Sequence, residues 1–224
     1  SKRMFERYEL NRFPLEKSED RALKVSEVNA CTKFENPFCF NKPFNLGVDG
    51  ATSGDSFAIV AHQRHDGDID AFHEWVFDTP GPSGYYDLVE IEELIAWLYS
   101  KYRCPVYIDP ARLLLMAQQL QDRYNVPIVE VAQSNKIMCA ASDMLNRSVK
   151  EKKARLDGCP ILIEHLKNCR VMVREPYGWR YTSTKHGQGS ERIDAAIAAT
   201  IAKYATATAP EPVSFVESGG IWSV

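Results

Sequence analysis

The chain of 224 residues contains 45% hydrophobic and 25% charged residues, which excludes a disordered, collagen-like or fibrous protein. Its longest run of small or apolar residues, near 195–202, is far shorter than the roughly 20 residues that cross a bilayer. The charged segment 1–13 also lacks the apolar centre of a signal peptide, so we expect no membrane partner. None of the six cysteines belongs to a C-x-x-C pair, which argues against a zinc ribbon or a disulfide framework and favours a reducing compartment.

The net charge of −3 is unevenly distributed along the chain. Residues 46–110 carry three Lys/Arg against twelve Asp/Glu, a net charge of −9. Residues 111–192 carry fourteen against eight, a net charge of +6. A carboxylate-rich segment followed by a basic one suits a metal site beside a phosphate-binding surface, and solvated surface of either sign is the simpler alternative.

The first part of the chain predicts an arm followed by three strands. Residues 1–44 show little periodicity and are interpreted as an arm or linker with one short helix near 18–31. Three short apolar runs separated by turn-forming clusters then predict an antiparallel meander with strands at 45–49, 56–62 and 71–78.

Beyond the Pro/Gly-rich loop 79–84, helical and strand-like periods alternate. The predicted helices are 87–102, 111–124, 134–155, 161–168 and 190–205, the strands are 105–109 and 127–132, and 170–174 with 179–183 form a β-hairpin. The predicted fold class is α/β, a mixed β-sheet flanked by helices on both faces with the hairpin added, in an order similar to the ribonuclease-H-like fold. The predicted domains are the arm 1–44, a globular domain 45–205 and a loose tail 206–224.

Three aspartates stand at the ends of predicted elements. Asp49 ends the first strand, Asp109 ends the fourth, and Asp194 lies in the first turn of the last helix, on the side that faces the sheet. Three carboxylates that meet at one point require a strong positive charge between them. Oxygen ligands without a Cys or His cluster suit Mg²⁺ or Mn²⁺, and two such ions about 3.5–4 Å apart would support phosphodiester hydrolysis.

Each aspartate also has a simpler interpretation. Asp49 precedes Gly50 and could be a turn residue. Asp109 precedes Pro110 and could cap the helix that follows. Asp194 could complement the dipole of its helix. Their joint placement is what favours a metal site.

Four segments resemble, in order, the large terminase subunit of tailed bacteriophages, and its carboxy-terminal nuclease half in particular. They are FERYELNRF at 5–13, LGVDGATSGD at 46–55, YIDP at 107–110, and Lys185 followed by RIDAAIAA at 192–199. The sequence departs from the family at Phe13, where Trp is frequent, at Gly50, where an aliphatic residue is frequent, and at Ala195, where Gly is frequent.

The resemblance implies a ribonuclease-H-like endonuclease that cuts concatemeric double-stranded DNA, with metal-binding acidic positions at Asp49, Asp109 and Asp194. It implies a two-ion Mg²⁺ or Mn²⁺ site, the hairpin close to it, and Glu191 as a further acidic group where some relatives have His. It also implies an upstream ATPase half, a portal and a small terminase subunit as partners, and the host bacterial cytoplasm as location. No G-x-x-x-x-G-K-[ST] phosphate loop occurs in this chain, and we expect the isolated domain to be monomeric.

Basic residues beside these motifs are candidates for DNA contacts. Lys185 lies in a Gly/Ser/Thr-rich loop just before Asp194 and is predicted to contact a phosphate, whereas its neighbour His186 is interpreted as a solvated loop residue. A second set lies at the end of a predicted helix, where interaction with the helix carboxyl terminus is the alternative: Arg147, Lys150, Lys152, Lys153 and Arg155.

Two other functional classes remain open from the sequence. Another ribonuclease-H-like enzyme, such as a junction resolvase or a transposase core, would show structure-specific cleavage or strand transfer. A non-catalytic module that docks on the portal would show neither.

Overall fold

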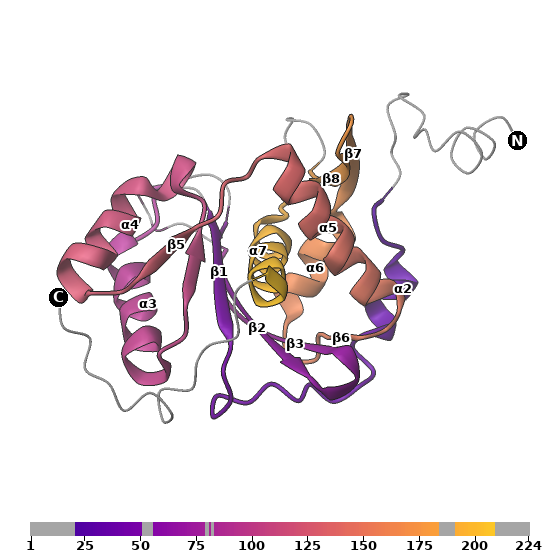
Figure 1. Cartoon of the computed structure of the whole chain (residues 1–224), viewed down its shortest axis with the longest axis horizontal. Coiled ribbons are helices and arrows are strands. Elements are labelled where there is room, and N and C mark those ends of the chain that lie inside the picture. Colours follow the sequence, from indigo (N-terminus) through magenta and orange to yellow (C-terminus); the bar gives the residue numbers. More distant parts are fainter. Residues whose placement is uncertain (1–20, 51–55, 79–80, 82, 184–190, 209–224) are drawn as a thin grey trace, which may run out of the picture.

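The computed structural model describes residues 21–50, 56–78, 81, 83–183 and 191–208. They form a six-stranded mixed sheet with helices on both faces and a separate two-stranded sheet, which confirms the predicted fold class (Figure 1). The strands are β1 Asn45–Gly50, β2 Phe57–His65, β3 Ile69–Phe77, β4 Val106–Ile108, β5 Ile128–Glu130, β6 Ala154–Arg155, β7 Arg170–Arg174 and β8 Gly178–Thr182. The helices are α2 Val25–Ala30, the short 3-10 helix η1 Asp66–Asp68, α3 Leu88–Tyr102, α4 Pro110–Tyr124, α5 Asn135–Lys150, α6 Pro160–Asn168 and α7 Asp194–Thr208. Among these described helices, none is long and apolar enough to cross a membrane.

The strand order of the large sheet is β5-β4-β1-β2-β3-β6. β2 runs antiparallel to β1 and β3, whereas β4 is parallel to β1 and β5 is parallel to β4. The carboxyl ends of β1, β3, β4 and β5 therefore lie at one edge of the sheet, and β2 begins there. We call this the carboxyl edge.

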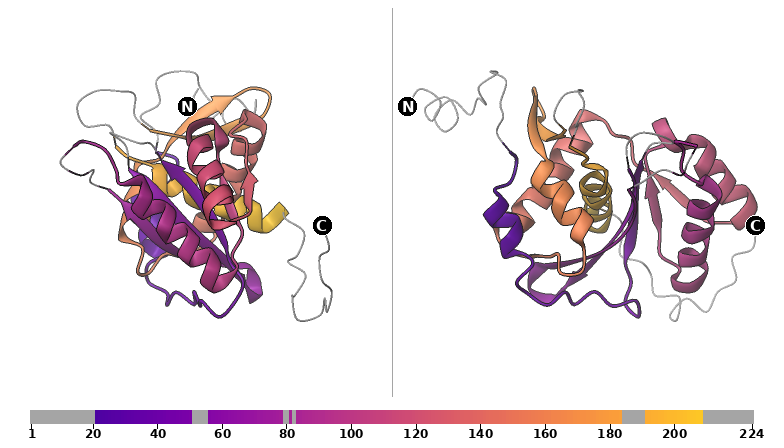
Figure 2. Two further views of the ribbon diagram at one scale, coloured as in Figure 1. Left: turned by 90° about the vertical axis from the view of Figure 1, so that its left-hand side faces the viewer. Right: turned by 180° about the vertical axis from the view of Figure 1, so that it is seen from behind.

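Helices cover the two faces of the sheet with separate apolar cores. α5, α6 and α7 lie on one face, and α3 and α4 lie on the other (Figures 1 and 2). α7 crosses β1 so closely that a Cβ placed on Gly47 would lie 2.1 Å from the carbonyl oxygen of Ala198. Only glycine permits this approach, which fixes the height of α7 above the strand that carries Asp49.

The described part of the predicted arm packs against the domain. Leu23, Val28 and Cys31 are buried in the core that contains α5, α6 and α7. Phe38 and Phe40 pack against the core on the other face. Apolar burial therefore joins residues 21–44 to both layers of the fold.

Among the helices that follow β3, two differ from their predicted bounds by more than one residue. α5 ends at Lys150 rather than at Arg155, because Lys152 adopts a left-handed backbone conformation with φ 57° and Ala154–Arg155 pair with β3 as strand β6. The last helix begins at Asp194 rather than at Ser190 and continues to Thr208. Asp194 is thus the first residue of α7, in its first turn as predicted.

A buried polar network joins β2, β3, α5 and α7 beneath the carboxyl-terminal part of α7. Asp70 accepts hydrogen bonds from His62 Nε2 at 2.9 Å, from Lys203 Nζ at 2.5 Å and from the Ser148 hydroxyl. Burial raises the pKa of Asp70, but the His62 hydrogen bond and the Lys203 charge outweigh burial and hold this pKa below its usual value of 3.8. Burial lowers the pKa of His62 below 6.5. The network therefore attaches α7 to the sheet by an ion pair and hydrogen bonds as well as by apolar packing.

Candidate active site

Asp49 and Asp109 lie side by side at the carboxyl edge. Val48 of β1 pairs in parallel with Ile108 of β4, so each aspartate directly follows a paired residue. Neighbouring strands are about 4.8 Å apart, which brings the two backbones close. Both side chains are buried, with 5% of each residue exposed.

The two aspartates also project to the same face of the sheet. Side chains alternate along a strand, and Asp49 stands two residues after Gly47, which faces α7. Asp109 stands two residues after Tyr107, which belongs to the core on the α7 side. Both carboxylates therefore lie on the α7 face, where that helix begins.

Asp194 lies at the first turn of α7 and is also buried, with 7% of the residue exposed. Its Oδ2 accepts hydrogen bonds from the backbone N–H of Ser56 at 3.2 Å and from the Ser56 hydroxyl at 2.6 Å. The backbone N–H of Ala195 donates to Nδ1 of the buried His165 at 3.0 Å. Burial lowers the pKa of His165, which favours the neutral ring that can accept this bond. These bonds fix the amino terminus of α7 at the carboxyl edge.

Two polar residues that the sequence analysis did not identify join this site. Gln133, which lies between β5 and α5, donates through Nε2 to Asp49 Oδ1 at 3.2 Å. Arg180 of β8 donates to the Gln133 carbonyl oxygen at 3.2 Å and to its Oε1 at 3.3 Å. Burial lowers the pKa of Arg180, and the charges of Asp49 and Asp109 oppose that shift. The predicted position of the hairpin near the site therefore agrees with the contacts of Arg180.

Sequence signals for the additional residues are of unequal strength. Gln133 and Ser56 could have been found, because each lies where a strand ends or begins at the edge that carries the aspartates. No such signal marks Arg180, because only the packing of the hairpin on α5 brings it to Gln133. Tyr181 provides that packing: it is 2% exposed and its backbone N–H donates to the Ser142 hydroxyl at 3.2 Å.

The three aspartates share an edge and a face without forming a closed metal cage. Among the residues that the structure describes, no three His, Cys, Asp or Glu side chains are grouped closely enough to hold a metal ion. The donor set is nevertheless made of buried carboxylate oxygens, which are the ligands that Mg²⁺ and Mn²⁺ prefer. Simultaneous binding by all three aspartates requires their side chains to turn toward one another.

The other predicted residues near Asp194 have different outcomes. Lys185 and His186 lie outside the described residues. Glu191 accepts a hydrogen bond from Arg170 Nη2 at 2.8 Å and lies 3.9 Å from Arg21 Nη2. Glu191 precedes α7 and is bound to two arginines, so its geometry favours an ion-pair role rather than a metal ligand.

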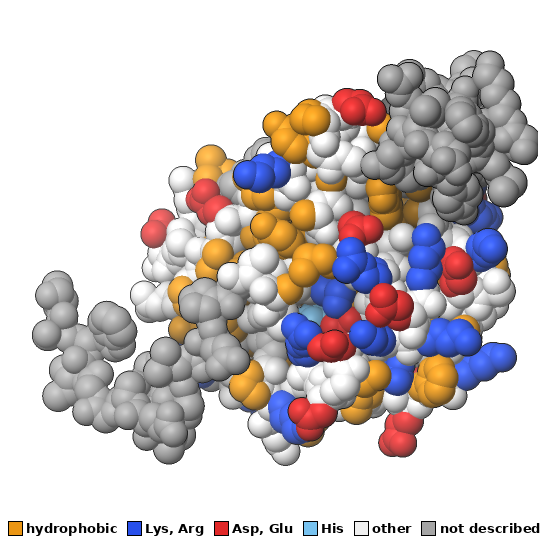
Figure 3. Space-filling view, turned by 45° about the vertical axis from the view of Figure 1, so that its right-hand side comes forward, with side chains coloured by type: hydrophobic (Ala, Val, Ile, Leu, Met, Phe, Trp, Pro, Cys, Tyr) orange, Lys and Arg blue, Asp and Glu red, His pale blue; other side chains and the backbone are white. Residues whose placement is uncertain are grey.

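The second basic set lies at the far end of α5 from the aspartates. α5 has 16 residues and is therefore roughly 24 Å long, with Gln133 near its first turn and Lys150 at its last residue. Arg147 pairs with Asp143, and Lys153 pairs with Glu151 and Asp68. Figure 3 shows this side of the molecule, where Lys and Arg side chains alternate with carboxylates. The structure therefore separates Arg147, Lys150, Lys152, Lys153 and Arg155 from the three aspartates.

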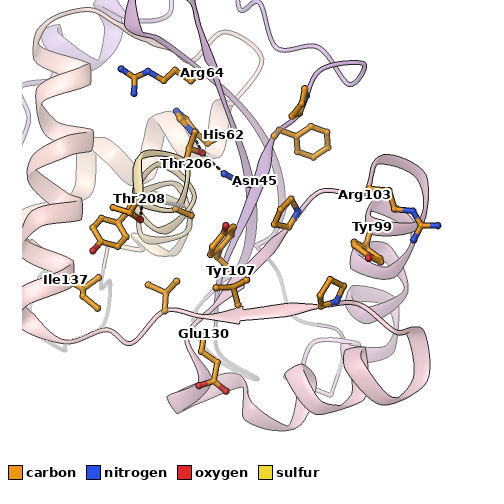
Figure 4. A pocket seen from close by; sticks show the side chains of 18 residues that line it. Asn45, His62, Arg64, Tyr99, Arg103, Tyr107, Glu130, Ile137, Thr206 and Thr208 are labelled. Atoms are coloured by element: carbon orange, nitrogen blue, oxygen red, sulfur yellow. Dashed lines mark hydrogen bonds between the residues drawn. The ribbon is translucent and has the colours of Figure 1, made fainter. Parts of the chain in front are cut away.

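A large cavity, with a volume of about 1590 Å³, lies toward the opposite end of α7 (Figure 4). Tyr107, His62 and Thr206 contribute to its wall, and none of the three aspartates does. His62 and Asn45 are both bonded to the Thr206 hydroxyl there. The cavity reaches Glu130 and Val131 at the end of β5 but not the three aspartates.

The description "Terminase large subunit, endonuclease domain" belongs to a family model that matches residues 69–211. The matched segment covers more than half of the chain and includes Asp109 and Asp194, and it begins after Asp49. Among curated proteins, none matches the chain in sequence.

Solved structures show the same fold at low sequence identity. The large terminase of bacteriophage HK97 is 18% identical with a TM-score of 0.68, and the match covers 83% of this chain and 43% of that one. The large terminase nuclease of thermophilic phage G20c with bound magnesium is 11% identical with a TM-score of 0.57, covering 84% and 98%. The nuclease domain of the bacteriophage SPP1 large terminase with bound Mn is 14% identical with a TM-score of 0.50, covering 80% and 90%. The chain therefore corresponds to less than half of the HK97 protein and to nearly all of the isolated G20c nuclease.

Proposed function

The chain belongs to the family of terminase large subunit endonuclease domains, and from this premise we propose that it cleaves double-stranded DNA by metal-dependent phosphodiester hydrolysis at Asp49, Asp109 and Asp194. The observation that carries the proposal is the placement of Asp49 and Asp109 on adjacent parallel strands, on the face where α7 begins with Asp194. The cleaved DNA would be the concatemeric viral genome during packaging.

We propose that the three carboxylates hold two Mg²⁺ or Mn²⁺ ions. The relatives from phages G20c and SPP1 were solved with magnesium and Mn, which supports the choice of metal. A pair of such ions would supply an activated water and stabilise the leaving oxygen. Repulsion between buried carboxylates disfavours the site without a cation, and this repulsion provides affinity for a divalent metal.

The surrounding residues determine where the three carboxylates lie. Ser56 holds one oxygen of Asp194, and Gln133 holds one oxygen of Asp49. These two hydrogen bonds hold the carboxylates that would bind the metal ions. The close contact between α7 and Gly47 then sets the separation of Asp194 from the two strand aspartates.

DNA contacts beyond the carboxylates are part of the proposal. We propose that Lys185 contacts the scissile phosphate, because it precedes Asp194 by only nine residues in the sequence. The set Arg147, Lys150, Lys152, Lys153 and Arg155 would contact the duplex away from the cleavage point, at a distance of roughly one helix length.

In the complete packaging protein, we propose that this domain works with an ATPase half, the portal and the small terminase subunit in the cytoplasm of the host bacterium. Those partners would hold DNA at high local concentration, which would compensate for weak binding by a domain of net charge −3. We propose that the isolated domain is a monomer that needs divalent metal but no ATP.

Plasmid cleavage tests the proposed function. Supercoiled plasmid is incubated at low salt with Mn²⁺, with or without ATP and EDTA, and with wild-type protein or Asp109→Asn. Wild-type cleavage should not require ATP and should stop with EDTA, and Asp109→Asn should lower the rate by orders of magnitude while retaining the fold. Cleavage that survives EDTA, or an unchanged rate in the Asn variants of all three aspartates, would contradict the assignment.

A further inference from the structure

The hairpin β7–β8 reaches the candidate active site through one arginine and one glutamine. Arg180 contacts Gln133 at two oxygens, and Gln133 in turn contacts Asp49. The three groups come from three separate parts of the fold: a hairpin strand, the segment before α5, and the edge of β1.

The donor and acceptor groups in these contacts fix the orientation of the Gln133 side-chain amide. The Gln133 amide has an N–H₂ donor and a carbonyl acceptor, and the donor is directed at Asp49 while the acceptor receives the Arg180 guanidinium. Arg180 also binds the Gln133 backbone, which holds main chain and side chain together. A guanidinium that donates to Oε1 specifies which end of the amide faces the carboxylate.

The hairpin is itself anchored to the rest of the domain, so it can hold Arg180 in a fixed position against Gln133. Tyr181 is buried beside Arg180 and its N–H donates to Ser142 of α5. Arg170 of β7 bonds to Glu191, just ahead of α7. Both strands of the hairpin are thereby connected, at the end away from its turn, to α5 and to the segment that precedes α7.

We propose that Gln133 and Arg180 are positioning residues for Asp49: Gln133 fixes the orientation of its carboxylate, and Arg180 fixes Gln133. The hairpin would then raise metal affinity without contacting the metal. This inference rests on the proposed metal site and adds a support that the three aspartates alone do not provide. Outer partners of metal ligands contribute about 10–100-fold to metal affinity or activity.

The test is a Mn²⁺ titration by calorimetry on wild type, Gln133→Met, Arg180→Met and the double variant. Methionine matches glutamine in length, is shorter than arginine, and removes the hydrogen-bond donors of both. Gln133→Met should weaken Mn²⁺ binding by about 10-fold or more. Arg180→Met should weaken it in the same direction, and the double variant should bind no more weakly than Gln133→Met, because Arg180 acts through Gln133.

Controls separate positioning from stability and from failure of the metal site. Gln121→Met, on the exposed face of α4, should bind Mn²⁺ like wild type. The thermal midpoint in EDTA reports folding, and Arg180→Leu replaces Arg180→Met if the latter unfolds. Asp49→Asn measured alongside reports the metal site itself: if wild type also fails to bind, the proposed function fails rather than this inference.

Three results would overturn the inference while the metal site stands. One is unchanged Mn²⁺ affinity in Gln133→Met. Another is additive weakening in the double variant, which would make the two residues independent. The third is tighter Mn²⁺ binding in Arg180→Met, which would make Arg180 a competitor of the metal rather than a support.

Discussion

Substitution of Gly47 by alanine tests whether the spacing between β1 and α7 controls the site. The new Cβ would lie 2.1 Å from the Ala198 carbonyl oxygen and 2.6 Å from the Ala202 nitrogen. Cβ contacts shorter than 3.0 Å are essentially never found, so α7 must move away from β1 by about 1 Å. Both opposing atoms belong to the backbone, so no side-chain rotation relieves the contact. We therefore expect a loss of about 3 kcal/mol in the free energy of unfolding, the upper end for an overpacked core.

The same displacement should impair cleavage in the molecules that remain folded. Asp194 is carried by α7, and a misplacement of about 1 Å can cost roughly 100-fold in rate. Urea unfolding followed by circular dichroism gives the stability, and plasmid cleavage with Mn²⁺ gives the rate. Gly81→Ala is the matched control, because its nearest contact is an ordinary 3.5 Å to the Tyr85 carbonyl oxygen and its stability should change by less than about 0.5 kcal/mol. Equal stability and equal activity of the two variants would show that the spacing between β1 and α7 does not control the site.

Three further predictions concern charge. Asp70→Asn leaves the partly buried Lys203 without its carboxylate partner and should cost about 3 kcal/mol at pH 7 in urea unfolding. An unchanged urea midpoint would show that the network does not stabilise the fold. Wild-type stability should fall as the pH drops below about 6.5, because the pKa of His62 is lowered in the folded state and the unfolded chain therefore binds that proton more readily. Stability should fall further below about pH 3.8, because the pKa of Asp70 is lowered in the folded state and its carboxylate loses its stabilising contribution as it becomes protonated. Urea midpoints that stay constant from pH 7.5 to 4.5 would contradict the His62 part. Lys185→Ala should weaken DNA cleavage and retain Mn²⁺ binding, and a rate equal to wild type at every salt concentration would return Lys185 to solvated surface.

Most elements of the sheet and its helices could be predicted from the sequence because their signals are local. Short apolar runs bounded by turn-forming residues mark β2 and β3. Asp87 is a favourable residue to cap α3, and its carboxylate accepts from the backbone N–H groups of Val89 and Glu90. The end of α5 could not be predicted. Residues 151–155 contain good helix formers, and it is the pairing of β6 with β3 that removes them from the helix.

In the candidate site, too, some residues could be predicted from local sequence signals and others could not. Asp49, Asp109 and Asp194 stand at element ends, so their positions follow from the order of strands and helices. Gln133 and Arg180 meet through tertiary packing between a hairpin and a loop, which no sequence period records. The basic residues at the end of α5 show the converse: within this dense charge pattern, Arg147 and Lys153 form ion pairs with neighbouring carboxylates in the structure.

A crystal of the chain soaked in Mn²⁺ and measured for anomalous scattering tests the central claim most directly. We expect two Mn²⁺ peaks, about 3.5–4 Å apart, in contact with Asp49, Asp109 and Asp194 at the carboxyl edge. We also expect that Asp109→Asn crystals treated in the same way lose at least one of these peaks. Well-ordered wild-type crystals with no peak between the three aspartates, or with Mn²⁺ bound only elsewhere on the chain, would contradict it.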